Sequence, residues 1–168
     1  MKKILIVSAT KKTNYTLAKK LKNLIKTDIE VTLISLEDYM LPVYTEGVFE
    51  SKKESYKKTV VSLTNYFVKS DGIIICGPEY NGSTPPIINN SIAWISSSTD
   101  YWRDAFNNKI VLIGTSSGGL GTKFITALKI QLEHLGCTVL PKTISVNNST
   151  PLNVESAHKI LNQFIKLL

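Results

Sequence analysis

The chain has little cysteine and little histidine, with two of each among its 168 residues. Cys76 and Cys137 lack the CxxC spacing of metal and redox sites, so we expect buried, reduced thiols, with a redox disulfide as the alternative. His134 and His158 stand alone, and for His134 we expect only a favourable interaction with the end of a helix. The sequence therefore predicts no metal site. It also contains no Gly-x-Ser-x-Gly elbow, and we expect no catalytic side chain.

Arginine is nearly absent, because Arg103 is the only one beside 19 lysines (20 Lys+Arg minus 1), although the net charge is +7. Eight lysines precede Asp28, the first acid, and such a skew attracts anionic ligands, either a phosphate-bearing cofactor or nucleic acid. Nucleic-acid recognition favours arginine, and no helix-turn-helix, RRM or zinc-finger pattern is present, so we expect no nucleic-acid partner. Four of these lysines are expected on the polar face of a helix: Lys19, Lys20, Lys22 and Lys26.

Long apolar runs are missing too. No run approaches the roughly 20 residues of a membrane-spanning helix, so we expect no membrane partner. The run Ile4–Val7 is shorter than the roughly 7–15 apolar residues of a signal peptide, and we expect a strand there in a cytoplasmic protein. With 43% apolar and 20% charged residues, the composition suits one globular domain over residues 1–168.

The stretch DGIIICGPEYNGSTPPIINNSIAW, residues 71–94, is the most informative part of the sequence. Ile73–Cys76 is an apolar run that predicts a strand buried on both faces of a parallel sheet. Asn81-Gly82 is a turn dipeptide, and Pro85-Pro86 marks a helix start with Ser83 or Thr84 as its cap. Loops at the carboxyl ends of strands line the ligand crevice of open α/β sheets. We therefore expect residues 79–83 to line a ligand site.

This stretch resembles the GPEYNGS-x-P-G-x-x-K-N-A-x-D-W signature of the NADPH-dependent FMN reductase family, with seven consecutive positions matching. The resemblance implies an α/β, flavodoxin-like fold, a doubly wound five-stranded parallel sheet in the order 2-1-3-4-5 with helices on both faces. It also implies FMN as cofactor and NADPH or NADH as hydride donor. The alternative is a turn-rich connector with a buried tyrosine. Six residues would line the flavin ring: Pro78, Glu79, Tyr80, Asn81, Gly82 and Ser83.

A second candidate loop, SATKKTN, joins a strand predicted at Lys3–Ser8 to a helix predicted from Thr13 to about Lys26. In a doubly wound fold this loop binds phosphate, and residues 10–14 offer hydroxyls, lysines and an amide. The family usually has G-S-x-R-x-x-S-x-N here, whereas this chain has Ser8-Ala9 in place of Gly-Ser. For Thr13, helix capping without a ligand is the alternative. The resemblance implies that the FMN phosphate is held by Ser8, Thr10, Lys11, Thr13 and Asn14.

A third candidate loop, TSSGGLGTK, follows a strand predicted at Lys109–Thr115. It is no Walker A motif, because Gly121-Thr122-Lys123 breaks the required Gly-Lys order, and it lacks the third glycine of a Rossmann fingerprint. Its glycines allow a flat ligand to approach the backbone. The loop resembles the family's S-x-x-G-G-x-G-G segment, which covers the pyrimidine side of the flavin. The matching residues are Ser116, Ser117, Gly118 and Gly119.

The remaining segments complete the expected alternation of strands and helices. The helix at Pro86–Ser97 is too apolar for a solvent-facing helix, so part of its surface is expected to meet a second subunit. Tyr101 and Trp102 either extend that patch or fill the core. The resemblance implies a homodimer or a homotetramer. Other predicted elements are a strand at 29–36, helices at 52–69, 123–135 and 154–168, and an edge strand at 137–146 that Pro141 interrupts.

The resemblance implies a ping-pong reaction in which NAD(P)H reduces the flavin and leaves before a second substrate takes the electrons. That acceptor would be a flavin, a quinone or a similar small molecule. We expect the Glu79 side chain to turn outward and pair with a basic residue, across a subunit boundary in one arrangement. Two alternatives stay open. One is a flavodoxin-like electron carrier, although such carriers are usually acidic and this chain has a pI near 9.3. The other is a flavin-free sensor or scaffold.

Overall fold

A single parallel sheet forms the centre of the computed structural model, which describes residues 1–25 and 28–168. Its strands are β1 (Lys3–Ser8), β2 (Glu30–Ser35), β3 (Gly72–Cys76), β4 (Ile110–Ser116), β5 (Thr138–Val139) and β6 (Ile144–Val146). The order is β2-β1-β3-β4-β5, and β6 also pairs with β4. The doubly wound sheet predicted from the sequence is thus confirmed, with one strand added.

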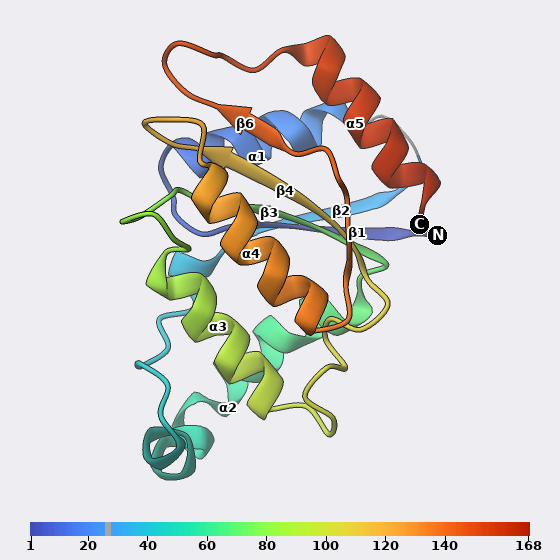
Figure 1. Ribbon diagram of the computed structural model, residues 1–168. Coiled ribbons are helices and arrows are strands. Elements are labelled where there is room, and N and C mark those ends of the chain that lie inside the picture. Colours follow the sequence, from blue (N-terminus) through green and yellow to red (C-terminus); the bar gives the residue numbers. More distant parts are fainter. Residues whose placement is uncertain (26–27) are drawn as a thin grey trace.

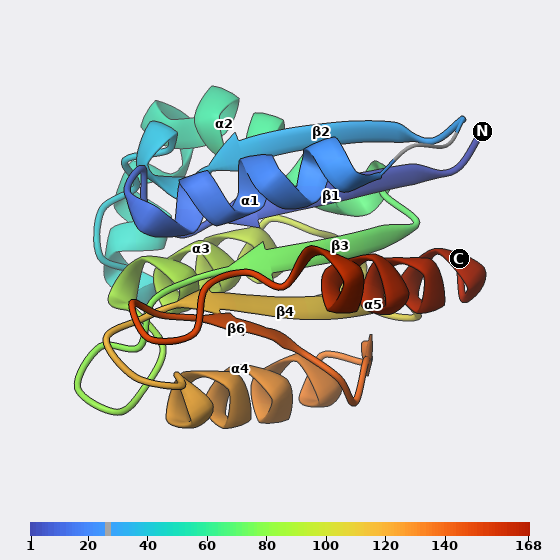
Figure 2. The ribbon, with the colours of Figure 1, turned by 90° about the horizontal axis from the view of Figure 1, so that it is seen from above.

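Helices cover both faces of this sheet (Figures 1 and 2). They are α1 (Thr13–Leu24), α2 (Glu46–Lys69), α3 (Pro86–Ser97), α4 (Thr122–His134), α5 (Val154–Lys166) and a short 3-10 helix, η1 (Leu36–Asp38). Ile73 and Ile75 of β3 join the core under α2, α3 and α4, whereas Ile74 and Cys76 join the core under α1 and α5. The apolar run of β3 is therefore buried on both faces, as predicted. Within the described residues, no helix is long and apolar enough to cross a membrane.

The sixth strand arises where the last predicted strand divides in two. β5 pairs with the start of β4, through Ile110 and Val111, and β6 pairs with its end, through residues 114–116. Pro141 lies between the two pieces, and a proline cannot donate a hydrogen bond to the neighbouring strand. The predicted place at the edge of the sheet and the interruption at Pro141 are confirmed, but one interrupted strand was predicted where the structure has two separate strands.

The observed boundaries of the strands and helices agree with the predicted boundaries to different degrees. β1 and α3 begin and end at the predicted residues. α1 ends at Leu24, and Lys26, where its end was expected, lies outside the described residues. α2 begins six residues before the predicted Lys52, after Thr45, whose Oγ1 accepts a hydrogen bond from the Val48 N–H at 3.1 Å. The residue that caps α3 is Pro85, so the predicted cap at Ser83 or Thr84 was wrong.

The apolar surface of α3 is largely covered by this chain itself. Trp94 is fully buried, and its Nε1–H donates to the Pro42 carbonyl at 2.8 Å. The second subunit inferred from this helix therefore stays a prediction. Tyr101 and Trp102 are 52% and 38% exposed, so their alternative role of filling the core was wrong. Trp102 instead lies against Arg103, whose guanidinium carbon is 4.3 Å from the ring centre.

Candidate functional site

The three candidate loops leave the sheet side by side. Ser8 and Cys76, the last residues of β1 and β3, are register partners, and Cys76 also pairs with Gly114, two residues before the end of β4. The ladder continues one residue further, where the Ala9 N–H donates to the Cys76 carbonyl at 2.8 Å and the Gly77 N–H to the Gly114 carbonyl at 3.1 Å. All three loops therefore start at the carboxyl edge of the central strands, where ligands bind in such sheets.

The loop after β3 folds into a tight turn. Tyr80 and Ser83 exchange two backbone hydrogen bonds of 3.1 and 3.0 Å. Between them Asn81 and Gly82 have φ angles of +50° and +72°, which an Asn-Gly pair adopts at little cost. The turn leaves Tyr80 49% exposed. The predicted turn is thus confirmed, and it presents an aromatic face to solvent.

Glu79 anchors this loop to the third one. Its carboxylate Oε2 accepts hydrogen bonds from the Lys123 and Phe124 N–H groups, at 3.0 and 3.2 Å. These are free donors of the first turn of α4, where a negative charge also interacts favourably with the helix dipole. The Glu79 N–H in turn donates to Ser117 Oγ at 2.8 Å. The expected outward pairing with a basic residue was therefore wrong, because the helix end supplies the partners.

Lys11 is turned away from the start of α1 and toward η1. Its N–H donates to a Glu37 carboxylate oxygen at 2.5 Å, and its Nζ forms an ion pair with Asp38. The hydrogen bond to Asp38 and the charge of that carboxylate raise the pKa of Lys11. These two acids follow β2, and the sequence reasoning had not connected them with the first loop. Both the backbone and the side chain of Lys11 therefore serve to hold this loop in place.

Lys12, rather than Thr13, is the residue that precedes the first turn of α1, so the predicted cap at Thr13 was wrong. Among the described residues, no side chain caps this end of the helix. The first main-chain bond joins the Tyr15 N–H to the Lys12 carbonyl at 3.0 Å, which leaves the Thr13 and Asn14 N–H groups without a partner inside the helix. The start of α1 is therefore a pair of outward-pointing donors beside a lysine, suited to a phosphate.

Asn14 holds the first and third loops together. It is buried, its Nδ2 donates to the Ser116 carbonyl at 2.9 Å, and its Oδ1 accepts from the Ser116 N–H at 2.8 Å. Ser8 is also committed locally, because its hydroxyl donates to the Thr10 carbonyl at 2.7 Å. The side chains of Ser8 and Asn14 therefore shape the site by holding its loops.

The third loop is fixed at Ser117 and open at its glycines. Ser117 Oγ lies 2.9 Å from Thr115 Oγ1, and the Ser117 N–H donates to the Val146 carbonyl at 3.2 Å. At Gly118 and Gly119, by contrast, a Cβ atom would meet nothing within 4 Å. These glycines border unfilled space next to the turn that carries Tyr80. A planar ligand can approach the backbone there, and the phosphate donors at α1 lie along the same edge, so the residues present fit FMN.

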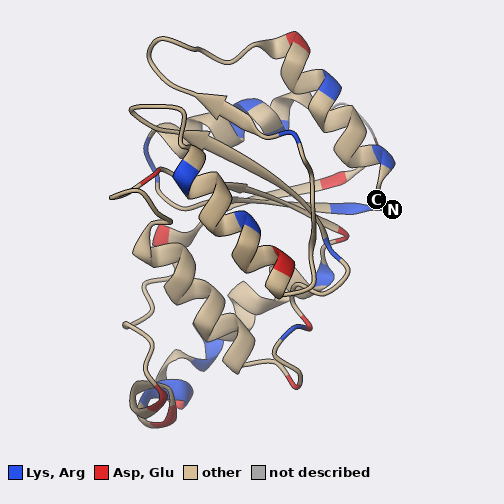
Figure 3. Cartoon of the chain, in the orientation of Figure 1, with Lys and Arg blue, Asp and Glu red and all other residues tan. Residues whose placement is uncertain are grey.

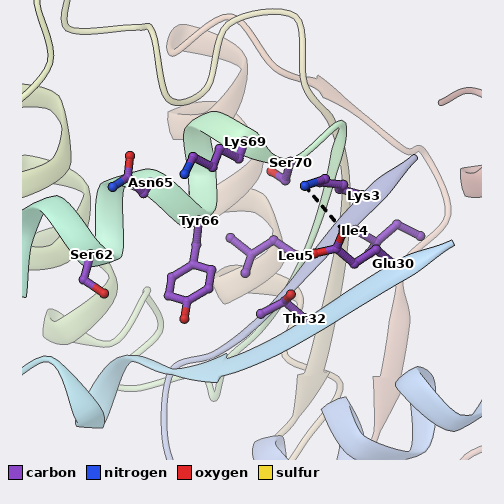
Figure 4. A pocket seen from close by; sticks show the side chains of 10 residues that line it. All are labelled: Lys3, Ile4, Leu5, Glu30, Thr32, Ser62, Asn65, Tyr66, Lys69 and Ser70. Carbon is purple, nitrogen blue, oxygen red and sulfur yellow. Dashed lines mark ion pairs between the residues drawn. The ribbon is translucent and has the colours of Figure 1, made fainter. Parts of the chain in front are cut away.

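Three hollows surround the loops and the sheet. One of about 480 Å³ begins at the start of α1 and touches Ser116. Another of about 620 Å³ lies between residues 39–44 and α3 and reaches Thr84, directly after the central turn. A third, of about 310 Å³, is shown in Figure 4 between Lys3, Glu30 and the end of α2. It lies at the opposite, amino end of β1 and β2, and therefore outside the site.

Both cysteines lie in the core of the protein. Cys76 and Cys137 are free, buried thiols, as predicted. Burial raises the pKa of each to about 12. Among the residues that the structure describes, no three His, Cys, Asp or Glu side chains are grouped to hold a metal ion.

A model of the family described as NADPH-dependent FMN reductase matches residues 1–151. The chain is 34% identical over 104 residues to a quinone reductase of Escherichia coli, covering 61% of this chain and 53% of that protein. It thus spans about half the length of the curated relatives it matches.

Solved structures share the fold. FerB, a flavoenzyme NAD(P)H:(acceptor) oxidoreductase from Paracoccus denitrificans, superposes with a TM-score of 0.79 over 99% of this chain and 97% of its own, at 22% identity. An archaeal flavodoxin superposes with a TM-score of 0.67 over 98% of each chain, at 13% identity. These likenesses confirm the flavodoxin-like fold.

Proposed function

Because the chain belongs to the NADPH-dependent FMN reductase family, we propose that it is an FMN-dependent oxidoreductase. It would take hydride from NADPH or NADH and pass electrons to a flavin, a quinone or a similar small acceptor. The observation that carries this proposal is the meeting of three loops at one sheet edge, with free helix N–H donors at α1 and open glycines at residues 118–119.

The contacts divide the predicted site residues into two groups. Thr10 and Thr13, with the outward N–H groups at the start of α1 and the side chain of Lys12, would hold the FMN phosphate. Ser8, Lys11, Asn14, Glu79 and Ser117 would act mainly by holding the loops in position, through the hydrogen bonds described above. Residues nearest the ring would be Pro78, Tyr80, Asn81, Gly82, Ser83, Ser116, Gly118 and Gly119.

FMN, when bound, supplies the two-electron chemistry, and the protein supplies position and hydrogen bonds. Tyr80 would form one wall by ring contact, and the backbone at residues 118–119 would approach the pyrimidine side. Donor and acceptor would use the same open side in turn, which is the ping-pong order. The apolar hollow beside residues 39–44 and α3, about 620 Å³ in size, gives a flat organic acceptor a place next to the ring.

The test is to titrate the purified protein with FMN and then to add NADPH without oxygen while recording the visible spectrum. We expect the bound flavin band to bleach within seconds and to return when a quinone is added. A flavin that binds but stays oxidised would instead indicate an electron carrier reduced by a protein partner. Failure to bind FMN would contradict the assignment of all three loops.

A further inference from the structure

A groove extends from the phosphate end of the proposed site along the outside of α1. One wall consists of Lys12, which precedes the first turn of α1, and of Thr16 and Lys20, which lie four residues apart on one face of the helix. Eight residues of helix rise about 12 Å, so this wall is longer than a single phosphate requires. The hollow has a volume of about 480 Å³, within the usual size of a small-molecule site.

The opposite wall belongs to β6 and the segment that follows it. Val146 and Leu152 are apolar and pack against the core under α1 and α5, and Pro151 lies beside them. The side-chain oxygen of Asn147 accepts hydrogen bonds from the N–H groups of residues 149 and 150, at 2.9 and 2.8 Å. These bonds fix the turn and leave the Asn147 amide N–H₂ as a polar donor in an apolar wall.

The groove is strongly positive. Lys12 and Lys20 are exposed, and neither forms an ion pair with any residue that the structure describes. Neither α1 nor the segment 147–152 contains an acid, and Figure 3 shows only basic charges on α1. The acids that reach the first loop, Glu37 and Asp38, are held by Lys11. An anionic group in the groove would therefore meet two lysines without a competing carboxylate.

These features together select one kind of ligand. Phosphate suits the lysines and the start of α1, while a flat ring with hydrogen-bond acceptors suits the apolar wall and the Asn147 amide. We propose that the groove binds an adenosine phosphate. Its source is either the AMP half of FAD, whose flavin half then takes the FMN position, or a separate adenine nucleotide bound next to FMN. The placement of FAD, with its flavin half in the FMN position, rests on the proposed function. The assignment of the groove itself does not.

The first experiment compares FAD with FMN by calorimetric titration of the apoprotein. FAD is expected to bind about tenfold more tightly than FMN, the effect of one added charge-assisted contact. Lys20→Glu should remove this advantage and leave FMN affinity within about twofold. The matched control is Lys22→Glu, which makes the same charge change on an exposed part of the same helix outside the groove. Circular dichroism verifies that both variants fold.

A second titration, of FMN-loaded protein with 5′-AMP, separates the two sources. The same titration of FAD-loaded protein is compared with it: AMP that binds only the FMN-loaded protein identifies the dinucleotide, because the AMP half of FAD then fills the groove, whereas AMP that binds both forms and weakens with Lys20→Glu identifies a separate nucleotide. The proposal is overturned if FAD has no advantage and AMP does not bind, or if Lys20→Glu and Lys22→Glu behave alike. AMP binding without any flavin binding would overturn the proposed function and leave the groove assignment intact.

Discussion

Glu79 is the residue whose role differs most from its expected one, and its contacts make a specific prediction. Glu79→Ala removes two hydrogen bonds to the first turn of α4, and loss of such a cap costs about 0.5–2 kcal/mol. We expect the free energy of unfolding in urea to fall by about 1–2 kcal/mol. FMN affinity should fall as well, because the turn carrying Tyr80 loses its anchor. Glu79→Gln keeps one acceptor oxygen, so its free energy of unfolding and its FMN affinity should lie between those of Glu79→Ala and those of the unchanged protein.

The control for this prediction is Glu54→Ala, which removes an exposed carboxylate whose ion pair with Lys57 is worth little. Equal stability losses in Glu79→Ala and Glu54→Ala would show that the cap of α4 contributes nothing.

The buried thiols predict how stability depends on pH. Burial raises the pKa of Cys76 from 9.0 to about 12, so the thiol stays protonated in the folded protein while the unfolded chain loses its proton above about pH 9. This contribution to stability is complete below the unfolded pKa and is lost as the pH rises toward 12. Urea unfolding between pH 7 and 10.5 should show a decline that is shallower in Cys76→Ala. The same slope in both proteins would contradict the assignment.

These residue roles explain what sequence reasoning missed. Asn14 contacts Ser116 and Glu79 contacts Lys123, pairs separated by 102 and 44 positions in the chain. The sequence indicated that each residue lies in a ligand loop, because local turn and strand signals suffice for that. It could not show that their side chains bind protein instead of ligand, since that depends on which helix end or strand end stands opposite.

At the scale of elements, prediction succeeded where a signal is local. The apolar run of β3 and the two prolines at the start of α3 gave elements close to those observed. The start of α2 was missed because Phe49 packs against Trp94, with ring centres 5.5 Å apart, and no periodicity within the helix reveals that contact. The division of the last strand shows the same limit, because Pro141 signalled an interruption but not the resumption of pairing at β6.

The third loop offers a matched pair of glycine substitutions. Gly121 has φ of +66°, and a Cβ atom there would lie 2.7 Å from Thr115 Cγ2. Gly121→Ala should therefore destabilise the protein by about 1–3 kcal/mol, through strain and through displacement of the start of α4. Gly118→Ala meets nothing within 4 Å and should change stability by less than about 0.5 kcal/mol.

The informative contrast lies in ligand binding. Gly118→Ala should weaken FMN binding despite its intact stability, because its new methyl group enters the space proposed for the ring. Thermal unfolding and calorimetric titration of both variants measure the two effects. If Gly118→Ala binds FMN as well as the unchanged protein does, the ring does not lie against this loop.

At the scale of the whole molecule, the net charge is a property that follows from neither the fold nor the three loops. A net charge of +7, with eight lysines before the first acid, produces a field that attracts anions from solution. Lys12, beside the first turn of α1, lies where that field would act on a phosphate approaching the helix. The predicted homodimer or homotetramer and the predicted cytoplasmic location depend on other features, and they stay predictions.

This charge should make the capture of FMN dependent on salt. Mobile ions reduce the range of the field from about 30 Å at 0.01 M ionic strength to about 3 Å at 1 M, so the association rate should fall roughly tenfold or more across that interval. Stopped-flow mixing of apoprotein with FMN, followed by flavin fluorescence, measures the rate. Riboflavin is the matched control, because it carries the same ring without the phosphate and should associate at nearly the same rate at every salt concentration. Equal salt dependence for FMN and riboflavin would mean that the lysines around α1 do not steer the phosphate, and that the protein's positive charge serves something other than its cofactor.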